Sequence, residues 1–343
     1  MTPPGTHIVR PARADDIDAL YELAKLTGGG FTNLPADRHA LVGKLDRSLV
    51  SFRHEHEEPG DDLFLLVLEE VATGHVRGTA QVFARVGARV PFYSYRIGAL
   101  SQTSRELGRT FRAEMLTLST DLEGASEVGG LFLHPAERAG GLGLLLARSR
   151  YLLIRRNRER FADRTIAELR GVINDAGTSP FWDGLGAKFF GMTFREADDF
   201  NAIHGHQFIA DLMPKHPIYT AMLPESARAV IGHPHASGRA AMRMLENEGF
   251  VFDRYVDIFD GGPTVTAETD RIRSIRKARA VKVSGTDLDP AGRRSLIARG
   301  GCDDFSVAFA IAVERYGGIA VDRDTATGMK LKEGDDVLWL EER

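Results

Sequence analysis

The chain has 343 residues, of which 43% are hydrophobic and 27% are charged, and its net charge at pH 7 is −4. These proportions are typical of a globular protein with a large core, and they exclude long disordered regions. The length suffices for about two domains. No segment combines basic and aromatic residues densely enough to predict nucleic acid as the main partner. The basic run at residues 148–164 is interpreted as a solvated helix face.

Cysteine usage and the N-terminus narrow the class further. The only cysteine is Cys302, which excludes an internal disulfide and a zinc site built from cysteines. Residues 1–7 lack the charged and then apolar pattern of a signal peptide, and no apolar run is long enough to span a bilayer. We therefore expect a cytoplasmic protein that does not bind a membrane.

The first elements are a strand and a helix. Residues 8–12 predict the strand, and residues 17–26 predict a helix capped by Asp15 or Asp16. The loop at residues 27–35 contains three consecutive glycines, which are costly to order. Two interpretations stay open for this loop. It is either a linker that ends the helix or a flexible loop that faces a substrate.

Strand patterns dominate the next part of the chain. Residues 63–68 and 76–83 are apolar runs on either side of Thr73-Gly74, and they predict a hairpin of central strands. Residues 91–98 predict a further strand. Its polar residues indicate that one face lies on a site or on solvent.

The stretch from Glu127 to Arg150 carries the clearest local pattern. Residues 128–133 predict a buried strand that ends at His134-Pro135, because proline removes a donor from the ladder. The pattern Arg-x-x-Gly-x-Gly follows at Arg138, Gly141 and Gly143 and opens into a predicted helix. Glycines at a helix start let backbone N–H groups approach an anion. The pattern predicts a phosphate cradle, although such turns also occur for conformational reasons alone.

The second half of the chain alternates strands and helices. Residues 165–173 predict a strand on which Glu168 and Arg170 share one face. We place residues 1–263 in the main region and residues 264–343 in a linker and a small β-rich domain. The other predicted elements are a helix at 181–190 capped by Ser179, a strand at 207–219, a helix at 240–248, and strands at 255–259, 305–313, 318–321 and 336–340.

Several long blocks of the sequence resemble the arginine N-succinyltransferase family, which belongs to the GNAT superfamily of acyl-CoA-dependent N-acyltransferases. The resemblance extends from the N-terminus to about Arg279 and is weaker beyond it. It implies an α/β (α+β) fold, with a GNAT-like mixed twisted sheet flanked by helices and a small C-terminal β-rich domain. The blocks that carry it are residues 27–35, 168–172, 179–182, 208–219 and 255–264.

The resemblance also implies an activity. Members of this family transfer a succinyl group from succinyl-CoA to the α-amino group of L-arginine, the first step of arginine breakdown to glutamate and succinate. The family uses no metal and no permanently bound cofactor, so succinyl-CoA is a co-substrate. Association of subunits in the family implies a homo-oligomer.

Particular residues acquire roles from the same resemblance. Leu131, with Leu133 on the same strand, corresponds to the residue of the family that contacts succinyl-CoA. The glycine turn at Arg138, Gly141 and Gly143 corresponds to the segment that binds the pyrophosphate of the acyl-CoA. The family's proton donor corresponds to His235 in Ile-Gly-His-Pro-His. A second histidine at His233 leaves it open which of the two acts.

The chemistry of amide formation adds further candidates. Backbone N–H groups at Gly130 and Leu131 can hold the thioester oxygen, and a histidine suits protonation of the departing thiolate. Glu168 either accepts the amine proton or pairs with Arg170. The pair of histidines at residues 204 and 206 is interpreted as a solvated loop, because no carboxylate or cysteine stands at metal-ligand spacing. For the charged ends of the two substrates we consider Arg96, Lys188, Lys215 and Asp211.

Two other functions are compatible with the sequence. One is a related N-acyltransferase that acts on ornithine or another amino acid, or that uses another acyl-CoA. The other is a non-catalytic acyl-CoA-binding subunit, since the family includes forms with paired subunits. Retention of Glu168 and His235 beside the complete glycine turn argues against the binding-only function.

Overall fold

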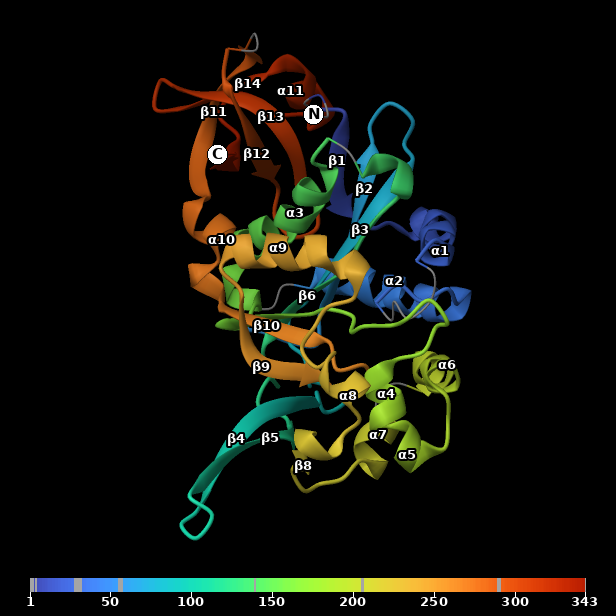
Figure 1. Cartoon of the computed structure of the whole chain (residues 1–343). Helices are drawn as coiled ribbons and strands as arrows, with labels where there is room; N and C mark the ends of the chain where they lie inside the picture. Colours follow the sequence, from blue (N-terminus) through green and yellow to red (C-terminus); the bar gives the residue numbers. More distant parts are fainter. Residues whose placement is uncertain are drawn as a thin grey trace. The chain divides into compact units, whose positions relative to one another are not determined.

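The computed structural model describes residues 3, 5–27, 33–54, 58–138, 140–204, 207–288 and 291–342 (Figure 1). The chain forms two compact units. Unit 1 consists of Met1–Arg85, Ser126–Asp163 and Glu268–Arg343, and unit 2 consists of Val86–Ala125 and Arg164–Ala267. Each unit is described separately below.

Unit 1 begins with an antiparallel sheet in the order β1-β2-β3-β6. The predicted hairpin is confirmed, because β2 and β3 pair from Leu63↔Phe83 to Glu69↔Val76. The first six residues of β2 are all buried, which is why this strand reads as one apolar run. The four strands are β1 (His7–Pro11), β2 (Leu63–Glu70), β3 (Val76–Phe83) and β6 (Ser126–Leu133).

Three helices cover this sheet: α1 (Ile17–Lys25), α2 (Arg38–Arg53) and α3 (Leu142–Arg156). A Cβ on Gly78 of β3 would lie 3.1 Å from Leu146 of α3, whereas Phe83 of the same strand lies under Lys44 of α2. Side chains of a strand alternate between its two faces, so positions an odd number of residues apart, such as Gly78 and Phe83, point to opposite faces. The helices α3 and α2 therefore cover opposite faces of β3. The helix α2 was not predicted from the sequence.

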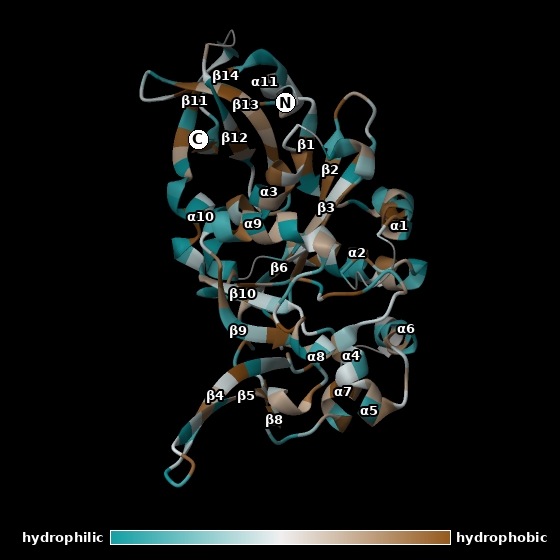
Figure 2. Ribbon diagram, viewed as in Figure 1, coloured by the Kyte–Doolittle hydropathy of each residue, from teal (hydrophilic) through white to brown (hydrophobic). Residues whose placement is uncertain are grey.

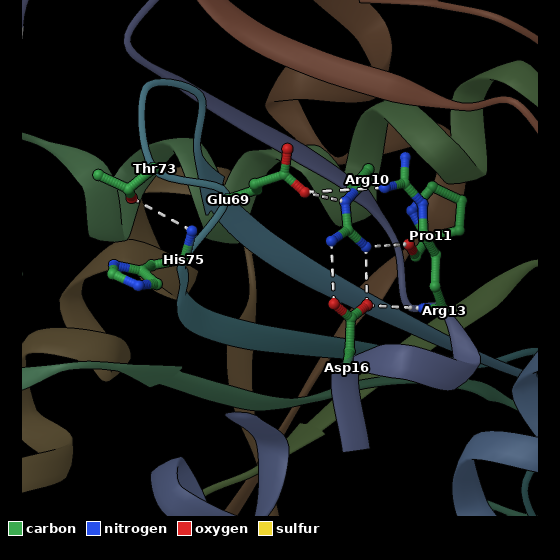
Figure 3. A network of polar contacts seen from close by, with 7 residues as sticks. All are labelled: Arg10, Pro11, Arg13, Asp16, Glu69, Thr73 and His75. Carbon is green, nitrogen blue, oxygen red and sulfur yellow. Dashed lines mark hydrogen bonds and ion pairs between the residues drawn. The ribbon is translucent and has the colours of Figure 1, made fainter. Parts of the chain in front are cut away.

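A buried arginine ties the first strand to the first helix (Figure 3). Arg10 donates to both carboxylate oxygens of Asp16, at 2.7 and 2.9 Å, and also to Glu69. Asp16 accepts the backbone N–H of Arg13 at 2.7 Å. The predicted aspartate therefore caps the short turn before α1, residues Ala14–Asp16, and not the first turn of α1 itself.

The C-terminal strands of unit 1 close into a five-stranded barrel in the order β12-β15-β11-β14-β13, with β13 pairing back to β12. Figure 2 shows the hydrophobic character of β13, of which Val307–Ala310 are buried. Trp339 packs inside and donates its indole N–H to Ser295 at 2.9 Å. The strands are β11 (Arg279–Leu288), β12 (Arg293–Arg299), β13 (Ser306–Arg315), β14 (Gly318–Asp322) and β15 (Asp336–Glu341), and the helices nearby are α10 (Arg273–Lys277) and α11 (Arg323–Gly328).

The division into units differs from the predicted boundary after residue 263. Val9 of β1 pairs with Val307 of β13, so the last part of the chain continues the sheet that the first part begins. Strand patterns identify a β-rich segment, but they do not specify which distant strand it joins. For that reason the sequence predicted a separate domain where the structure has one unit.

Unit 2 contains a second run of strands, in the order β7-β10-β9-β4-β5-β8. The strand predicted at residues 91–98 is longer, and with the unpredicted β5 it forms a hairpin that extends from Ser94↔Ser119 to Ser104↔Arg109. The strands are β4 (Ser94–Ser104), β5 (Arg109–Ser119), β7 (Arg164–Glu168), β8 (Ile218–Tyr219), β9 (Val251–Asp257) and β10 (Pro263–Glu268).

The helices of unit 2 correct two predictions. The predicted helix at 181–190 breaks in two, and a Cβ on Gly186 at the break would lie 2.4 Å from the Trp182 ring. The predicted strand at 207–219 is wrong over its first part, since residues 207–212 form the helix α7, which buries Ile209 and Ala210, and only the end of the range is the strand β8. The helices are α4 (Pro180–Gly184), α5 (Ala187–Phe190), α6 (Phe194–His204), α7 (Gln207–Leu212), α8 (Glu225–Arg228) and α9 (Arg239–Glu248).

Candidate functional site

The glycine turn leads directly into α3, as predicted. Gly140 and Gly141 both have positive φ, at 78° and 88°, and Gly141 is the N-cap of the helix. Gly143 lies in the first turn, where a Cβ would meet only Leu133, at 4.0 Å. Arg138, just before the turn, is exposed. The first N–H groups of a helix lack partners within it, so this turn offers donors to an anion.

The strand before the turn contains a β-bulge. Gln81 pairs with Gly129 and Thr79 with Phe132, so Gly130 and Leu131 stand opposite the single residue Ala80. Gly130 has a φ of 57°, and a Cβ there would lie 2.7 Å from the Gln81 side chain. The bulge therefore requires glycine and changes the direction in which the strand presents Leu131.

Unit 1 brings several predicted residues together. Leu133 lies between β3 and the first turn of α3, because its two methyl groups are close to Gly78 and Gly143. Both Leu131 and Leu133 are half-buried. The bulge, the two leucines and the glycine turn thus form a continuous path along β6 into α3.

A cation from the barrel also reaches the glycine turn. Arg294 of β12 donates through Nη2 to the carbonyl oxygen of Gly140 at 3.1 Å, and it lies over the ring of Phe309 at 3.7 Å. Its Nε is 3.2 Å from Glu342. Sequence reasoning missed Arg294, because no local pattern relates it to a turn so far away along the chain.

A group of polar side chains, two buried and two half-buried, lies beside the bulge, and it was also missed. Glu127 is 7% exposed, and Lys44 and Gln81 both donate to the carbonyl oxygen of Asn33, at 3.1 and 2.6 Å. Burial raises the pKa of Glu127 to about 7, against the opposing effects of Lys44 and of a hydrogen bond from the Asn33 side chain. Burial lowers the pKa of Lys44 to about 8. We call Glu127, Lys44, Asn33 and Gln81 the bulge cluster.

Unit 2 holds the other predicted residues. Glu168 ends β7 and accepts a hydrogen bond from Thr264 at 3.4 Å. Two residues further on, the carbonyl oxygen of Arg170 accepts the backbone N–H of His235 at 2.8 Å. The structure therefore brings the segment of His235 beside the continuation of the strand that carries Glu168.

The geometry distinguishes the two histidines. His233 is exposed. His235 is half-buried, and its Nδ1 accepts the backbone N–H of Ser237 at 3.3 Å, with the Ser237 hydroxyl at 2.7 Å. Because Nδ1 faces Ser237, Nε2 is the ring nitrogen that points away from this contact.

A buried carboxylate holds the segment of His235 in place. Asp260 accepts the backbone N–H groups of Gly171 at 2.7 Å and Gly262 at 2.8 Å, and Gly232 donates to the carbonyl oxygen of Gly261 at 2.8 Å. Burial, reinforced by the charge of Asp257, raises the pKa of Asp260 to about 7. The hydrogen bonds of this turn fix the loop before His235.

Comparison with known proteins assigns the family. The model of the arginine N-succinyltransferase beta subunit matches residues 7–274. Curated arginine N-succinyltransferases of Salmonella schwarzengrund and Salmonella agona are each 40% identical over 331 residues, 96% of both chains. The chain belongs to the arginine N-succinyltransferase family. The predicted resemblance and the prediction of an acyltransferase are thereby confirmed.

A solved structure of the same family agrees in fold. The arginine/ornithine succinyltransferase subunit AI from Pseudomonas aeruginosa matches with 31% identity and a TM-score of 0.89 over 98% of each chain. The predicted α/β class is confirmed. The name of that Pseudomonas protein includes both arginine and ornithine.

The remaining candidates of this family member lie apart from these groups. In unit 2, Arg96 faces Asp121 at 3.3 Å, Asp211 accepts from Gln207 at 2.7 Å, and Lys215 donates to the carbonyl of Ala210. Lys188 is exposed. Residues 28–32 of the triple-glycine loop and residues 205–206 of the two-histidine loop fall outside the described residues.

The described part of the chain contains no cluster of three or more histidine, cysteine, aspartate or glutamate side chains that could hold a metal ion. Among its helices, none combines the length and the apolar character needed to cross a membrane. One surface pocket of unit 1 lies between α3, α10 and the barrel, and in it Arg279 faces Glu314 at 3.4 Å.

Proposed function

We propose that this protein transfers the succinyl group of succinyl-CoA to the α-amino group of L-arginine, by direct attack of the amine in a ternary complex. The observation that carries the proposal is the path from the Gly130 bulge through Leu131 and Leu133 to the glycine turn, in a chain that belongs to this family. Succinyl-CoA is a co-substrate, and no cofactor is permanently bound.

The acyl-CoA is held by unit 1 in this proposal. Backbone N–H groups at Gly141 and Gly143 bind the pyrophosphate, since the N-terminus of α3 favours an anion. Arg138 and Arg294 add positive charge beside the turn. Leu131 and Leu133 contact the pantetheine arm, and the N–H groups at the bulge face the thioester oxygen, where negative charge develops.

His235 supplies the proton that the departing thiolate needs. Its Nδ1 is turned to Ser237, and the imidazolium form of the ring gives the proton to sulfur from Nε2 and becomes neutral. Glu168 is a candidate acceptor for the amine proton, and its contact with Thr264 is compatible with either a catalytic or a pairing role.

The two histidines provide a matched test. We expect His235→Ala to lower kcat by about 100-fold to 10,000-fold, the usual contribution of a general acid, with CoA affinity unchanged. His233→Ala should leave kcat within about twofold. Equal activity of the two variants would remove His235 as the proton donor.

Ornithine is a second candidate substrate, favoured by the similarity to the arginine/ornithine succinyltransferase subunit of Pseudomonas aeruginosa. It shares the α-amino and α-carboxylate groups of arginine and differs in the side-chain cation. A binding-only subunit is disfavoured by the fixed geometry of His235. A cytoplasmic location and a homo-oligomer, with no nucleic acid or membrane as partner, complete the proposal.

A further inference from the structure

The surface pocket of unit 1 between α3, α10 and the barrel takes no part in the proposed reaction. None of the described residues that line it belongs to the path from the bulge to the glycine turn. The short helix α10 packs against α3 at this place (Figure 1). The volume of the pocket is about 370 Å³, which lies within the range of small-molecule sites in proteins.

Positive charge predominates in the pocket. Glu341 also lies 3.2 Å from Arg293, which is outside the lining, and Arg148 lies 3.8 Å from Glu342, a carboxylate that it shares with Arg294. A concave surface with an excess of one sign of charge concentrates ions of the opposite sign, so we expect an anion here. The charged side chains of the described lining are four cations, Arg148, Arg273, Lys277 and Arg279, and two carboxylates, Glu314 and Glu341.

The helix α10 places two of these cations side by side. Arg273 and Lys277 are its first and last residues, and side chains four positions apart lie on the same face of a helix. Like charges at this spacing destabilise a helix, so an anion close to both cations would stabilise α10. Arg276 belongs to the same helix, but it is exposed and does not line the pocket.

A buried aromatic ring holds a third cation in place. The guanidinium of Arg279 lies 4.6 Å from the centre of the Trp339 ring, and Trp339 is fixed by its hydrogen bond to Ser295. The ion pair of Arg279 with Glu314 is 3.4 Å long, and both side chains are more than half exposed. Such a pair contributes little, so Arg279 can bind another anionic group. A guanidinium that is positioned in advance loses less entropy when it binds a carboxylate or phosphate.

We propose that this pocket binds a small organic dianion, a dicarboxylate or a phosphate monoester. Both kinds of ligand present the acidic oxygens that guanidinium and ammonium groups bind, and two negative charges match the excess of cations over carboxylates in the lining. Trp339 and Leu340 also line the pocket and give the carbon skeleton of such a ligand an apolar contact. The inference goes beyond the proposed function and does not depend on it.

The test is isothermal titration calorimetry of the full chain with malonate and with glycerol 3-phosphate, at low ionic strength to limit screening. Excess CoA occupies the proposed acyl-CoA site. We expect one site per chain for at least one probe, with a Kd below about 1 mM. Arg273→Gln should raise this Kd by about three- to tenfold. The matched control Arg276→Gln, on the same helix but outside the pocket, should leave it within about twofold.

A second variant should act in the opposite direction. Glu314→Gln removes a carboxylate beside Arg279 and should lower the Kd by about threefold or more. If Arg273→Gln does not fold, Lys277→Gln replaces it, because Lys277 is exposed and should show the same weakening. Binding of only one probe supports the proposal and identifies the class of the ligand.

Three results would overturn the inference. They are no binding of either probe up to about 10 mM, equal Kd values in Arg273→Gln and Arg276→Gln, and weaker binding in Glu314→Gln. Failure of the proposed function is a separate outcome, because then the wild type releases no CoA thiol from succinyl-CoA with L-arginine. The binding measurement needs no turnover and stays valid in that case.

Discussion

Unit 1 buries charge in two places, and the two places are built differently. In the network of Figure 3, Arg10 has a bidentate partner in Asp16, a second partner in Glu69 and a bond to the carbonyl of Pro11. In the bulge cluster, the acceptor Gln81 Oε1 has no partner among the described residues. In the first place the protein itself supplies the partners of the buried Arg10, whereas the second place keeps a buried acceptor that can bind a ligand.

The pKa values of Arg10 and Glu127 differ in the same way as the number of partners in the two places. Burial lowers the pKa of Arg10, but the hydrogen bonds and charges of Asp16 and Glu69 more than offset it, and the net direction is upward. For Glu127 the effect of burial exceeds that of its partners. A fully paired group is held in its charged form, and a partly paired one can change protonation near neutral pH.

The largest expected effect is on the saturated network. Arg10→Met should lower the free energy of unfolding by about 3–5 kcal/mol, because it leaves Asp16 and Glu69 without their buried partner. Urea denaturation measures it. Arg13→Met is the control, since Arg13 is exposed and 3.9 Å from Glu69, and its effect should stay below about 1 kcal/mol. A small effect for Arg10→Met would show that solvent screens the network.

Stability against pH should separate the bulge cluster from the network. The folded pKa of Glu127 is raised to about 7, so its contribution is present below the unfolded pKa and is lost as pH rises through 7. The unfolding free energy of the wild type relative to Glu127→Gln should fall by on the order of 1–3 kcal/mol from pH 5 to pH 8. Asp260, whose pKa is also raised, titrates in both proteins and cancels. A constant difference would place the Glu127 pKa at an ordinary value.

The bulge itself can be tested by adding one methyl group. Gly130→Ala should lower the free energy of unfolding by about 1–2 kcal/mol, since the residue has positive φ, and the new Cβ would also displace Gln81. The acyl-transfer rate should fall as well. Gly43→Ala in α2 is the control: nothing lies within 4 Å of its Cβ, and alanine favours a helix. Full activity in Gly130→Ala would separate the bulge from the chemistry.

Much of this architecture follows from local sequence patterns. The strand 128–133, the turn at Gly141 and the helix after it were predicted, because burial, proline and glycine act within a few residues. The run 207–219 was misread, since a short apolar segment fits a strand and a helix equally well. The electrostatic interaction between Lys44 and Glu127 was not predicted, because it depends on how distant elements pack.

The smallest expected effect concerns a contact of that kind. Arg294→Gln should raise the KM for succinyl-CoA by about three- to tenfold, with kcat unchanged, because a single charge-assisted contact contributes on the order of 1 kcal/mol. Arg293→Gln is the matched control on the same strand, with a side chain 75% exposed. Equal KM values in the two variants would exclude Arg294 from the acyl-CoA site.

The most direct test of the central claim is the release of free CoA thiol by the wild-type protein. Succinyl-CoA and acetyl-CoA are each combined with L-arginine and with ornithine. The account predicts fast turnover with succinyl-CoA and L-arginine and much slower turnover with acetyl-CoA. Absence of turnover with every pair would contradict it and would favour an acyl-CoA-binding subunit that needs a partner.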